Sequence, residues 1–419
     1  MEHDEVNPRK CSSRPAGGSP ATGTARRAFS ALALLLLASS AVTIVSCSLL
    51  FEAEPPVHTI SQAALPVGWP SVISVRLAEK APSLAVSSTS EGIWNSVEPG
   101  LWELPARTGT WKLEADGKSL KMDGNPVSAQ AVEFTPQDGI FRLGNEDFRG
   151  KLVVELDPDP KGGLIATNIV SMEDYLRGVL GGEMPSDWPK NALMAQAVAA
   201  RTFAVYRASA GGQKRAYLKR TDMAYKGIAR ESPETDKAVA KTAGIILTYG
   251  GAPFASYFST CCGGHTSSAE WVFHDVAPPP LQGVYCGWCE QSSHYQWTAT
   301  MTVAELSTKV AFWGIKNVDS IELGERDPAG RVQEVIINKT KKMSANEFRV
   351  AVGPNLIKST AFTKVSKMGD SFEFAGKGWG HGVGMCQYGA EAMARAGRSW
   401  RKVLVHYYPY AEITKVRLD

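Results

Sequence analysis

The sequence predicts an α+β protein in which an antiparallel, β-rich N-terminal part packs on a mixed α/β core with a central helix of small residues. Two observations support this class. Short segments of alternating apolar residues, separated by Gly, Asn and Asp, occupy residues 72–156, as in antiparallel sheets. Helical spacing of apolar residues comes later, and one such helix carries small residues at Ala192, Ala195, Ala199 and Ala200.

The composition is that of a globular protein large enough for two or three packed domains. The chain has 419 residues, of which 44% are hydrophobic and 21% are charged, and its formal net charge is +3. This near balance gives no reason to expect nucleic acid as a partner, so attraction to an acidic polymer would have to be local.

Residues 1–51 have the features of a targeting segment. Arg26-Arg27 precedes an apolar run over residues 28–51, which suits a signal peptide or a membrane anchor. Ile44-Val45-Ser46-Cys47 resembles a bacterial lipoprotein processing site, where the cysteine is acylated. We therefore expect a protein of the extracytoplasmic cell envelope, held at a membrane by its N-terminus. Acylation at Cys47 is favoured over an uncleaved anchor or simple secretion.

A linker over residues 52–71 and a β-rich domain over 72–165 are expected next. The predicted strands of this domain cover residues 72–77, 111–113, 120–122, 131–134, 140–143 and 152–156. No group of residues suited to catalysis occurs among them. The region is therefore interpreted as a β platform beside the remaining domain, residues 166–419.

A helix, a glycine-rich elbow and a second helix are predicted between Ser171 and Tyr206. The apolar spacing of the first helix stops at Gly181-Gly182, because glycine tolerates backbone conformations that other residues resist. Glu183 follows directly, which would place a lone carboxylate on a loop. The second helix points a few polar groups inward, among them Gln196 and Arg201.

Cysteines and histidines gather in the middle of this domain. Cys261-Cys262 and His265 lie on a glycine-rich strand end, and a C-x-x-C motif at Cys286 and Cys289 precedes His294. Two cysteines at this spacing can bind one tetrahedral ion, so we predict a structural zinc held by Cys262, Cys286, Cys289 and His294. His265 is an alternative fourth ligand. A disulfide or free thiols remain open alternatives, since disulfides are permitted in exported proteins.

Residues 298–372 read as an α/β region. Helices are predicted over residues 303–311 and 344–352, the second capped by Ser344, and strands over residues 320–323 and 332–337. The acidic residues of this region follow ordinary surface patterns. Helices over residues 390–396 and 400–408 close the domain.

A glycine-rich stretch near the C-terminus can bring the backbone very close to a ligand. It has five glycines in the nine positions 376–384. The Lys-Ser/Thr pair of a phosphate-binding loop is missing, and so is the dinucleotide fingerprint, which argues against a nucleotide. Trp379 offers a stacking face, while His381 and Gln387 offer hydrogen bonds. The alternative for His381 is a histidine satisfied within the core.

Two of these stretches together resemble the stage II sporulation protein D and LytB family of peptidoglycan lytic transglycosylases. Glu183 stands in the G-E-M-P motif, at the position of the family's catalytic acid. Residues 376–390 match G-x-G-x-G-H-G-V-G-M-x-Q-Y-G-A, with Cys386 where many relatives have serine. Some members of the family carry a zinc ion beside the cleft.

The resemblance implies cleavage of the β-1,4 bond between N-acetylmuramic acid and N-acetylglucosamine, giving 1,6-anhydro ends, with Glu183 as general acid and base. A single acid is enough, because the sugar's own 6-hydroxyl replaces water. The substrate-binding residues are then expected to be Gln196, Arg201, His265, Trp379, His381, Gln387 and Tyr388.

Two other functions remain open at this point. Some relatives enhance a cell-wall amidase, so the protein could bind peptidoglycan strands without cutting them and act through such a partner. A zinc hydrolase would need an open metal position beside a general base, whereas a set of three cysteines and one histidine is usually closed.

Overall fold

The computed structural model describes residues 54–61, 64–65, 69–98, 100, 102–159, 162–209, 217–274 and 276–417. The expected targeting segment, with Cys47, lies outside the described residues, as does part of the expected linker. Among the described residues, no helix has both the length and the apolar character that a bilayer span requires.

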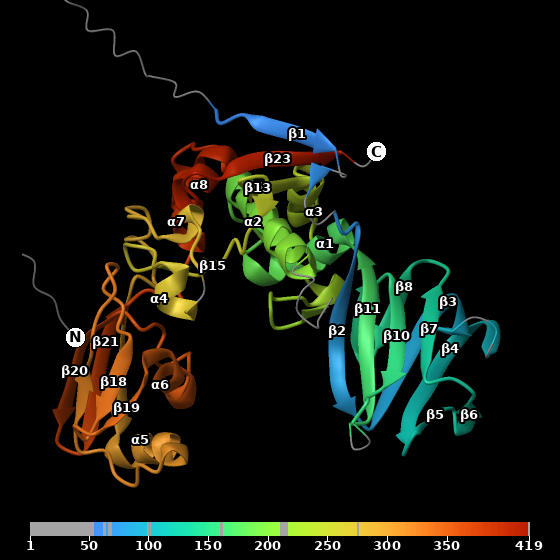
Figure 1. The fold of residues 1–419 in the computed structure, drawn as a ribbon, viewed down its shortest axis with the longest axis horizontal. Helices are drawn as coiled ribbons and strands as arrows, with labels where there is room; N and C mark the ends of the chain where they lie inside the picture. The colour runs from blue at the N-terminus through green and yellow to red at the C-terminus, as the bar shows by residue number, and fades with distance from the viewer. Residues whose placement is uncertain are drawn as a thin grey trace, which may run out of the picture. The chain divides into compact units, whose positions relative to one another are not determined.

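The α+β class is confirmed, with a large, almost entirely antiparallel sheet formed by the N-terminal part (Figure 1). The sheet has the order β12-β2-β11-β10-β7-β3-β4-β5-β6, and β8 and β9 extend it from β3. Only the short β12 is added in parallel. The strands are β2 (Val72–Ala81), β3 (Ser83–Ser96), β4 (Glu103–Asp116), β5 (Ser119–Met122), β6 (Asn125–Val127), β7 (Ala131–Pro136), β8 (Ile140–Leu143), β9 (Glu146–Arg149), β10 (Lys151–Leu156), β11 (Leu164–Ser171) and β12 (Leu218–Lys219).

Strand β3 is one of the two longest strands of this sheet, and the sequence pattern did not predict it. Its central residues are serines, threonine, glutamate and glycine, which weaken the apolar alternation, yet Leu84, Val86 and Trp94 are buried. Trp94 packs against Trp111 and Phe134, with ring centroids 6.0 and 4.9 Å away. Aromatic contacts between neighbouring strands therefore fix a strand that propensity alone does not reveal.

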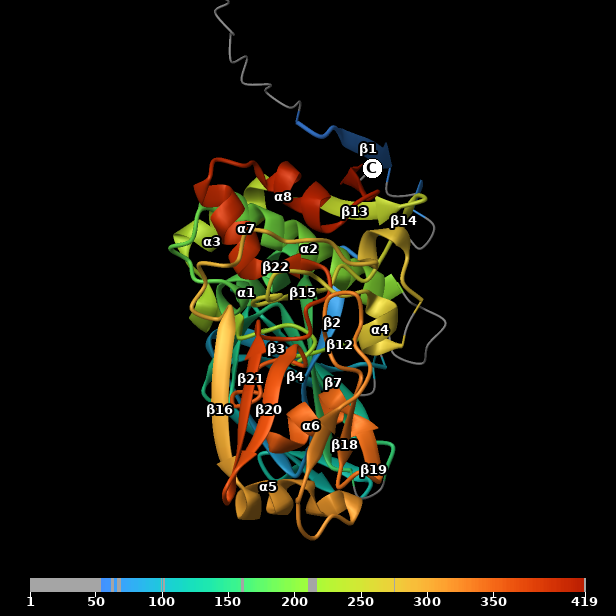
Figure 2. The ribbon, with the colours of Figure 1, turned by 90° about the vertical axis from the view of Figure 1, so that its left-hand side faces the viewer.

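The predicted central helix of small residues is confirmed as α2 (Lys190–Ser209). It packs against α1 (Met172–Glu183), α3 (Pro233–Lys241), α7 (Gln387–Arg395), α8 (Trp400–Tyr407) and strand β13 (Ile245–Tyr249). Its alanines from Ala192 to Ala204 are fully buried, which lets the surrounding elements approach closely. Figure 2 shows these helices gathered around α2. Ser171 caps α1 by accepting a hydrogen bond from the Asp174 backbone N–H, as expected of a helix N-terminus.

Two small sheets join distant parts of the chain to this helical layer. The first has the order β1-β23-β13-β14, in which β1 (Val57–Ser61) pairs in parallel with β23 (Glu412–Arg417), and β14 covers Ala252–Pro253. The second pairs β15 (Phe258–Ser259) with β22 (Met385–Cys386) in parallel. A short helix, α4 (Ala269–Phe273), follows β15.

A second hydrophobic core forms between residues 297 and 374. Its elements are β16 (Gln296–Thr302), α5 (Val303–Val310), β17 (Ile321–Leu323), β18 (Glu334–Ile337), β19 (Lys341–Ser344), α6 (Ala345–Val352), β20 (Phe362–Met368) and β21 (Ser371–Lys377). The predicted helices are confirmed, including the cap at Ser344. The predicted strand at residue 332 begins only at Glu334, because Val332 forms an isolated bridge with Arg326. The domain boundaries proposed from the sequence stay a prediction.

Candidate functional site

Glu183 is the last residue of helix α1, so the predicted glycine-rich elbow is wrong. Gly181 and Gly182 are helical, and their role is close packing. A Cβ at Gly181 would collide with the carbonyl oxygen of Arg230, and one at Gly182 with that of Ala224. Only glycine therefore allows α1 to lie against the segment from Ala224 to Arg230, and this contact places the Glu183 carboxylate.

Two hydrogen bonds hold the Glu183 side chain. The backbone N–H of Ala224 donates to Oε1 over 2.6 Å, and Gln387 Nε2 donates to Oε2 over 3.4 Å. The same Gln387 nitrogen also donates to the backbone oxygen of Glu183, over 3.2 Å. Burial raises the pKa of Glu183 above its ordinary value, and the two hydrogen bonds to the carboxylate oppose this only in part.

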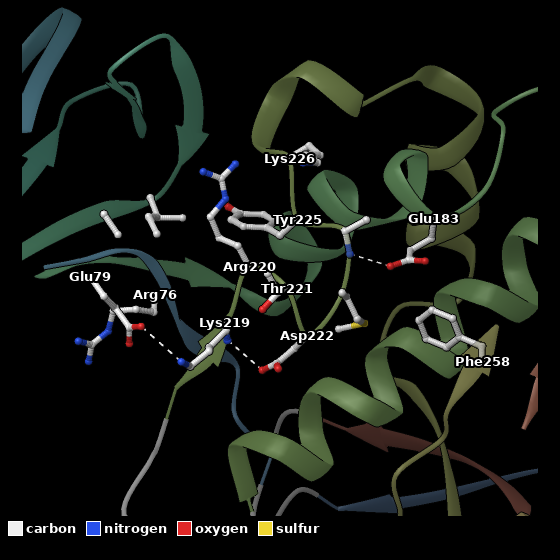
Figure 3. A pocket seen from close by; sticks show the side chains of 14 residues that line it. Arg76, Glu79, Glu183, Lys219, Arg220, Thr221, Asp222, Tyr225, Lys226 and Phe258 are labelled. Atoms are coloured by element: carbon white, nitrogen blue, oxygen red, sulfur yellow. Dashed lines mark hydrogen bonds and ion pairs between the residues drawn. The ribbon is translucent and has the colours of Figure 1, made fainter. Parts of the chain in front are cut away.

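The Glu183 carboxyl faces a pocket of about 770 Å³, shown in Figure 3. Strand β2 and the segment after β12 form most of its wall. The charged residues around it are Arg76, Glu79, Lys219, Arg220, Asp222 and Lys226. None of them was predicted as a site residue. The run Lys219-Arg220-Thr221-Asp222 could have indicated the site, because it is a charged turn between two predicted elements.

Several of these charges are paired with each other. Lys219 lies 3.3 Å from Glu79, and its backbone N–H donates to Asp222 Oδ2 over 2.9 Å. Arg220 forms two hydrogen bonds with Glu146, of 2.8 and 2.6 Å. Unlike Asp222 and Glu79, Glu183 has no cation within ion-pair distance among the described residues. Burial therefore raises the pKa of Glu183, with no neighbouring cation in the described part of the chain to oppose it.

The start of helix α7 brings two predicted site residues to Glu183. Cys386 caps this helix by accepting from the Gly389 N–H, and Gln387 follows it and reaches Glu183. Tyr388 comes next, and its ring lies 4.9 Å from that of Trp188, five residues beyond Glu183. Of these two expected substrate-binding residues, Gln387 therefore contacts Glu183 and Tyr388 contacts Trp188, and their binding of substrate stays a prediction.

His381 lies in a different environment from the one predicted. Its Nδ1 accepts from the Val383 N–H over 3.0 Å, and its ring packs near Phe273 and Tyr257, with centroids 5.2 and 6.0 Å away. Burial lowers the pKa of His381 to about 3, which keeps the ring neutral. His381 lines a small cavity of about 40 Å³ beside Arg331 and does not line the Glu183 pocket. This is the alternative of a histidine satisfied within the core.

Gln196 and Arg201 were expected to bind substrate, and the structure corrects this, because both are completely buried. Arg201 Nε and Nη2 donate to the Glu173 carboxylate over 3.0 and 2.6 Å. Its remaining donors reach backbone oxygens of Ala197, Val239 and Ile245. Arg201 therefore ties α2 to α1, α3 and β13.

We expect Arg201→Leu to lower the free energy of unfolding by about 3 kcal/mol, since it leaves Glu173 and several buried carbonyls without their donor. Urea denaturation measures the change. The control Arg207→Leu removes an arginine of the last turn of α2 whose side chain is 45% exposed, and should change the free energy of unfolding by less than about 0.5 kcal/mol. Equal losses in the two variants would contradict the structural role of Arg201.

Three of the four predicted metal ligands lie together with a further cysteine in one cluster. The sulfur atoms of Cys262, Cys286, Cys289 and Cys386 all lie within 4.8 Å of one another, and all four residues are buried. The described cysteines are free thiols, so the disulfide alternative does not appear among them. Four converging sulfur donors could hold one metal ion, because tetrahedral thiolate sets suit soft divalent ions.

His294 is not part of this cluster, which corrects the predicted fourth ligand. Its ring packs edge-on against Trp379 and Tyr388, with centroids 4.6 and 5.1 Å away. Cys386 takes the position because β22 pairs with β15, and the Cys262 N–H donates to Cys386 Sγ over 3.3 Å. His265, the alternative ligand, hydrogen-bonds the Thr266 carbonyl through Nδ1 over 2.7 Å. It lines a second large pocket, of about 500 Å³.

Comparison with protein families gives two matches along the chain. A family model described as stage II sporulation protein matches residues 160–249, which include Glu183. A model described as a domain of unknown function matches residues 287–384, which contain the second hydrophobic core.

Individual relatives match over longer stretches. An uncharacterized protein of Brachyspira hyodysenteriae is 36% identical over 299 residues, covering 70% of this chain and 79% of that protein. Stage II sporulation protein D of Bacillus subtilis is 34% identical over 267 residues, covering 59% and 75%. The amidase enhancer of Bacillus subtilis is 29% identical over 288 residues, covering 57% and 40%.

Proposed function

The chain belongs to the stage II sporulation protein D (SpoIID) family, and we propose that it is a cell-wall enzyme, a peptidoglycan lytic transglycosylase with Glu183 as general acid and base. The observation that carries this proposal is the position of Glu183, in a pocket of about 770 Å³, with a pKa raised by burial. A carboxyl with a raised pKa is suited to donate a proton.

The proposed reaction needs only one carboxyl group. Protonated Glu183 donates its proton to the glycosidic oxygen as the bond from that oxygen to C1 of N-acetylmuramic acid breaks. The Glu183 carboxylate then takes the proton of the 6-hydroxyl on the same sugar, whose oxygen bonds to C1. The products are a free 4-hydroxyl on N-acetylglucosamine and a 1,6-anhydro-muramyl end, and Glu183 is protonated again.

The neighbours of Glu183 have separate roles in this sequence of steps. The Ala224 N–H fixes Oε1, so the second oxygen of the carboxyl carries the proton toward the substrate. Gln387 donates to Oε2 over a long 3.4 Å. It therefore favours the carboxylate that forms after proton donation, and it holds the side chain in place for the second step.

Incubation with peptide-free glycan strands, followed by mass spectrometry of the products, tests the proposal. Release of chains ending in anhydro-muramic acid is expected. Intact strands would support the second candidate, a non-catalytic protein that binds the cell wall and increases the activity of a partner amidase. That candidate is favoured by the similarity to a protein named amidase enhancer. Addition of purified amidase to the same assay distinguishes the two candidates, because only the second predicts an increase in amidase activity without anhydro-muramyl products.

The cysteine cluster is proposed to hold one structural zinc ion. Four protein ligands close the coordination shell and leave no position for water or substrate, so the ion would not take part in bond cleavage. When bound, zinc cross-links the strand end at Cys262, the loop of Cys286 and Cys289, and the start of α7 at Cys386. This cross-link would hold Gln387 in reach of Glu183.

A substitution at Gln387 tests its influence on Glu183. Because this hydrogen bond lowers the pKa of Glu183, Gln387→Met should raise that pKa further. The acid form persists below the pKa, so the alkaline limb of the profile of kcat/KM against pH should move to higher pH. The control Gln137→Met, at an exposed turn, should leave the limb in place. A limb that stays in place or moves to lower pH in Gln387→Met would contradict the role of Gln387.

The site of action is proposed to be the extracytoplasmic cell envelope, where peptidoglycan lies. Relatives named for sporulation and for amidase enhancement support this location. Attachment to a membrane through an acylated Cys47 stays a prediction, since that residue lies outside the described part of the chain.

A further inference from the structure

Four aromatic side chains near the sequence neighbours of Glu183 and Gln387 form a row of ring contacts. Trp188 contacts Tyr388, Tyr388 contacts His294, and His294 contacts Trp379, with ring centroids 4.9, 5.1 and 4.6 Å apart. All four side chains are part-exposed. We call these four residues the aromatic row. Its first members are fixed to the catalytic residue, since Tyr388 follows Gln387 in the chain.

A chain neighbour of the row, Tyr295, lines the second large pocket. Tyr295 follows His294, and its carbonyl oxygen accepts from the Gly378 N–H, next to Trp379. Tyr295 also lines the pocket of about 500 Å³, together with Tyr285, whose side chain is 67% exposed. The two pockets share no lining residue. The row lies between the sequence neighbours of Gln387, which hydrogen-bonds Glu183, and of Tyr295, which lines the distal pocket.

Charged side chains that form no ion pair among the described residues line this distal pocket. Arg326 Nη1 donates to the carbonyls of Gly330 and Phe362 over 2.8 and 2.7 Å, which fixes the guanidinium while its other nitrogens stay available. Lys377 lies over the Tyr295 ring, 5.5 Å from its centroid. Within the described residues, neither Arg326 nor Lys377 forms an ion pair, and Glu290 accepts no side-chain hydrogen bond.

We propose that the aromatic row and the distal pocket bind a second stretch of an N-acetylated glycan strand, several sugars away from the bond that is cut. This inference rests on the proposed function. Pyranose rings present an apolar C–H face to an aromatic ring and hydroxyl and amide groups at their edges. Part-exposed rings followed by free hydrogen-bonding groups match that chemistry.

The position of the row explains what such a site would select. The row runs from Tyr388, next to the Glu183 partner Gln387, to His294, next to Tyr295 of the distal pocket, so a strand that occupies both pockets along this row would span several sugars. Binding at the two pockets by one strand converts the second contact into an intramolecular one, which raises affinity for long strands without any change at Glu183. The distal pocket thus makes the enzyme prefer strands over disaccharides.

Binding by calorimetry tests the inference in the full chain carrying Glu183→Gln, so that nothing is cleaved. The probes are β-1,4-linked N-acetylglucosamine hexamer and dimer. Tyr285→Ala together with Tyr295→Ala should weaken hexamer binding about tenfold or more and change dimer binding less than twofold. Tyr249→Ala is the matched control, because Tyr249 is 40% exposed on β13 and lines neither pocket. It should change neither affinity.

The outcomes separate this inference from the proposed function. Unchanged hexamer binding, or equal losses for hexamer and dimer, would overturn the distal site even if wild-type protein cuts strands. A selective loss for the hexamer in a protein that cuts nothing would support the site and refute only the cleavage. Circular dichroism of the double variant must match that of the parent. The single variant Tyr285→Ala, at an exposed position, gives a second test and should show the same selectivity with a smaller loss.

Discussion

Glu183→Gln should reduce the release of anhydro-muramyl ends by about 10²- to 10⁴-fold, the range that loss of a general acid and base costs. The amide keeps the shape of the side chain and its oxygen can still accept from the Ala224 N–H, but it has no proton of suitable acidity. Mass spectrometry of digested peptide-free strands measures the effect. The fold should persist, because replacing a part-buried carboxyl by a neutral amide removes the desolvation cost of its charged form.

The matched control for this experiment is Glu234→Gln, the same chemical change at an exposed position in the first turn of α3. It should leave cleavage unchanged. Substantial cleavage by Glu183→Gln would show that another group supplies the proton, and Asp222, in the same pocket, would be the first to examine. Loss of cleavage together with unchanged strand binding would distinguish an enzyme from a binding module.

Loss of the metal ion should be the largest change in stability. Protein purified without chelator is expected to contain about one zinc ion per chain, and Cys386→Ser should lose it. An ion present at a thousand times its dissociation constant stabilises the fold by about 4 kcal/mol, so the free energy of unfolding should fall by that order. Elemental analysis and chemical denaturation with and without added zinc measure the two effects.

His294→Ala is the informative control for the metal experiment, because it removes the ligand that the sequence suggested. It should retain the ion, since the His294 ring packs between Trp379 and Tyr388 and lies outside the sulfur cluster. Retention of zinc by Cys386→Ser and its loss from His294→Ala would reverse the assignment. A zinc-free protein with a mass two hydrogens lower and a cross-linked peptide containing Cys286 would establish the disulfide instead.

Sequence patterns predicted those features that depend on neighbouring residues. Ser344 caps its helix as expected, because a cap needs only the first turn that follows it. Glu183 and the C-x-x-C pair were found for the same reason, since two or three adjacent residues carry each signal. Strand β3 was missed because the serines and glycine at its centre interrupt the alternation of apolar and polar residues that predicts a strand.

Contacts between distant segments were decided by the tertiary structure. Pairing of β15 with β22 sets Ser259 opposite Cys386, which brings that sulfur to Cys262 and gives the sulfur cluster a fourth member in place of His294. The same pairing starts α7 where Gln387 reaches Glu183. The role of Arg201 also depended on distant contacts. A polar residue on a buried helix can bind substrate or tie helices together, and only its partners, such as Glu173, distinguish these two roles. The sequence by itself determined the fold class and the proposed acid, since both rest on local patterns. The fourth sulfur, the donor to Glu183 and the aromatic row depended on long-range packing, which local spacing does not encode.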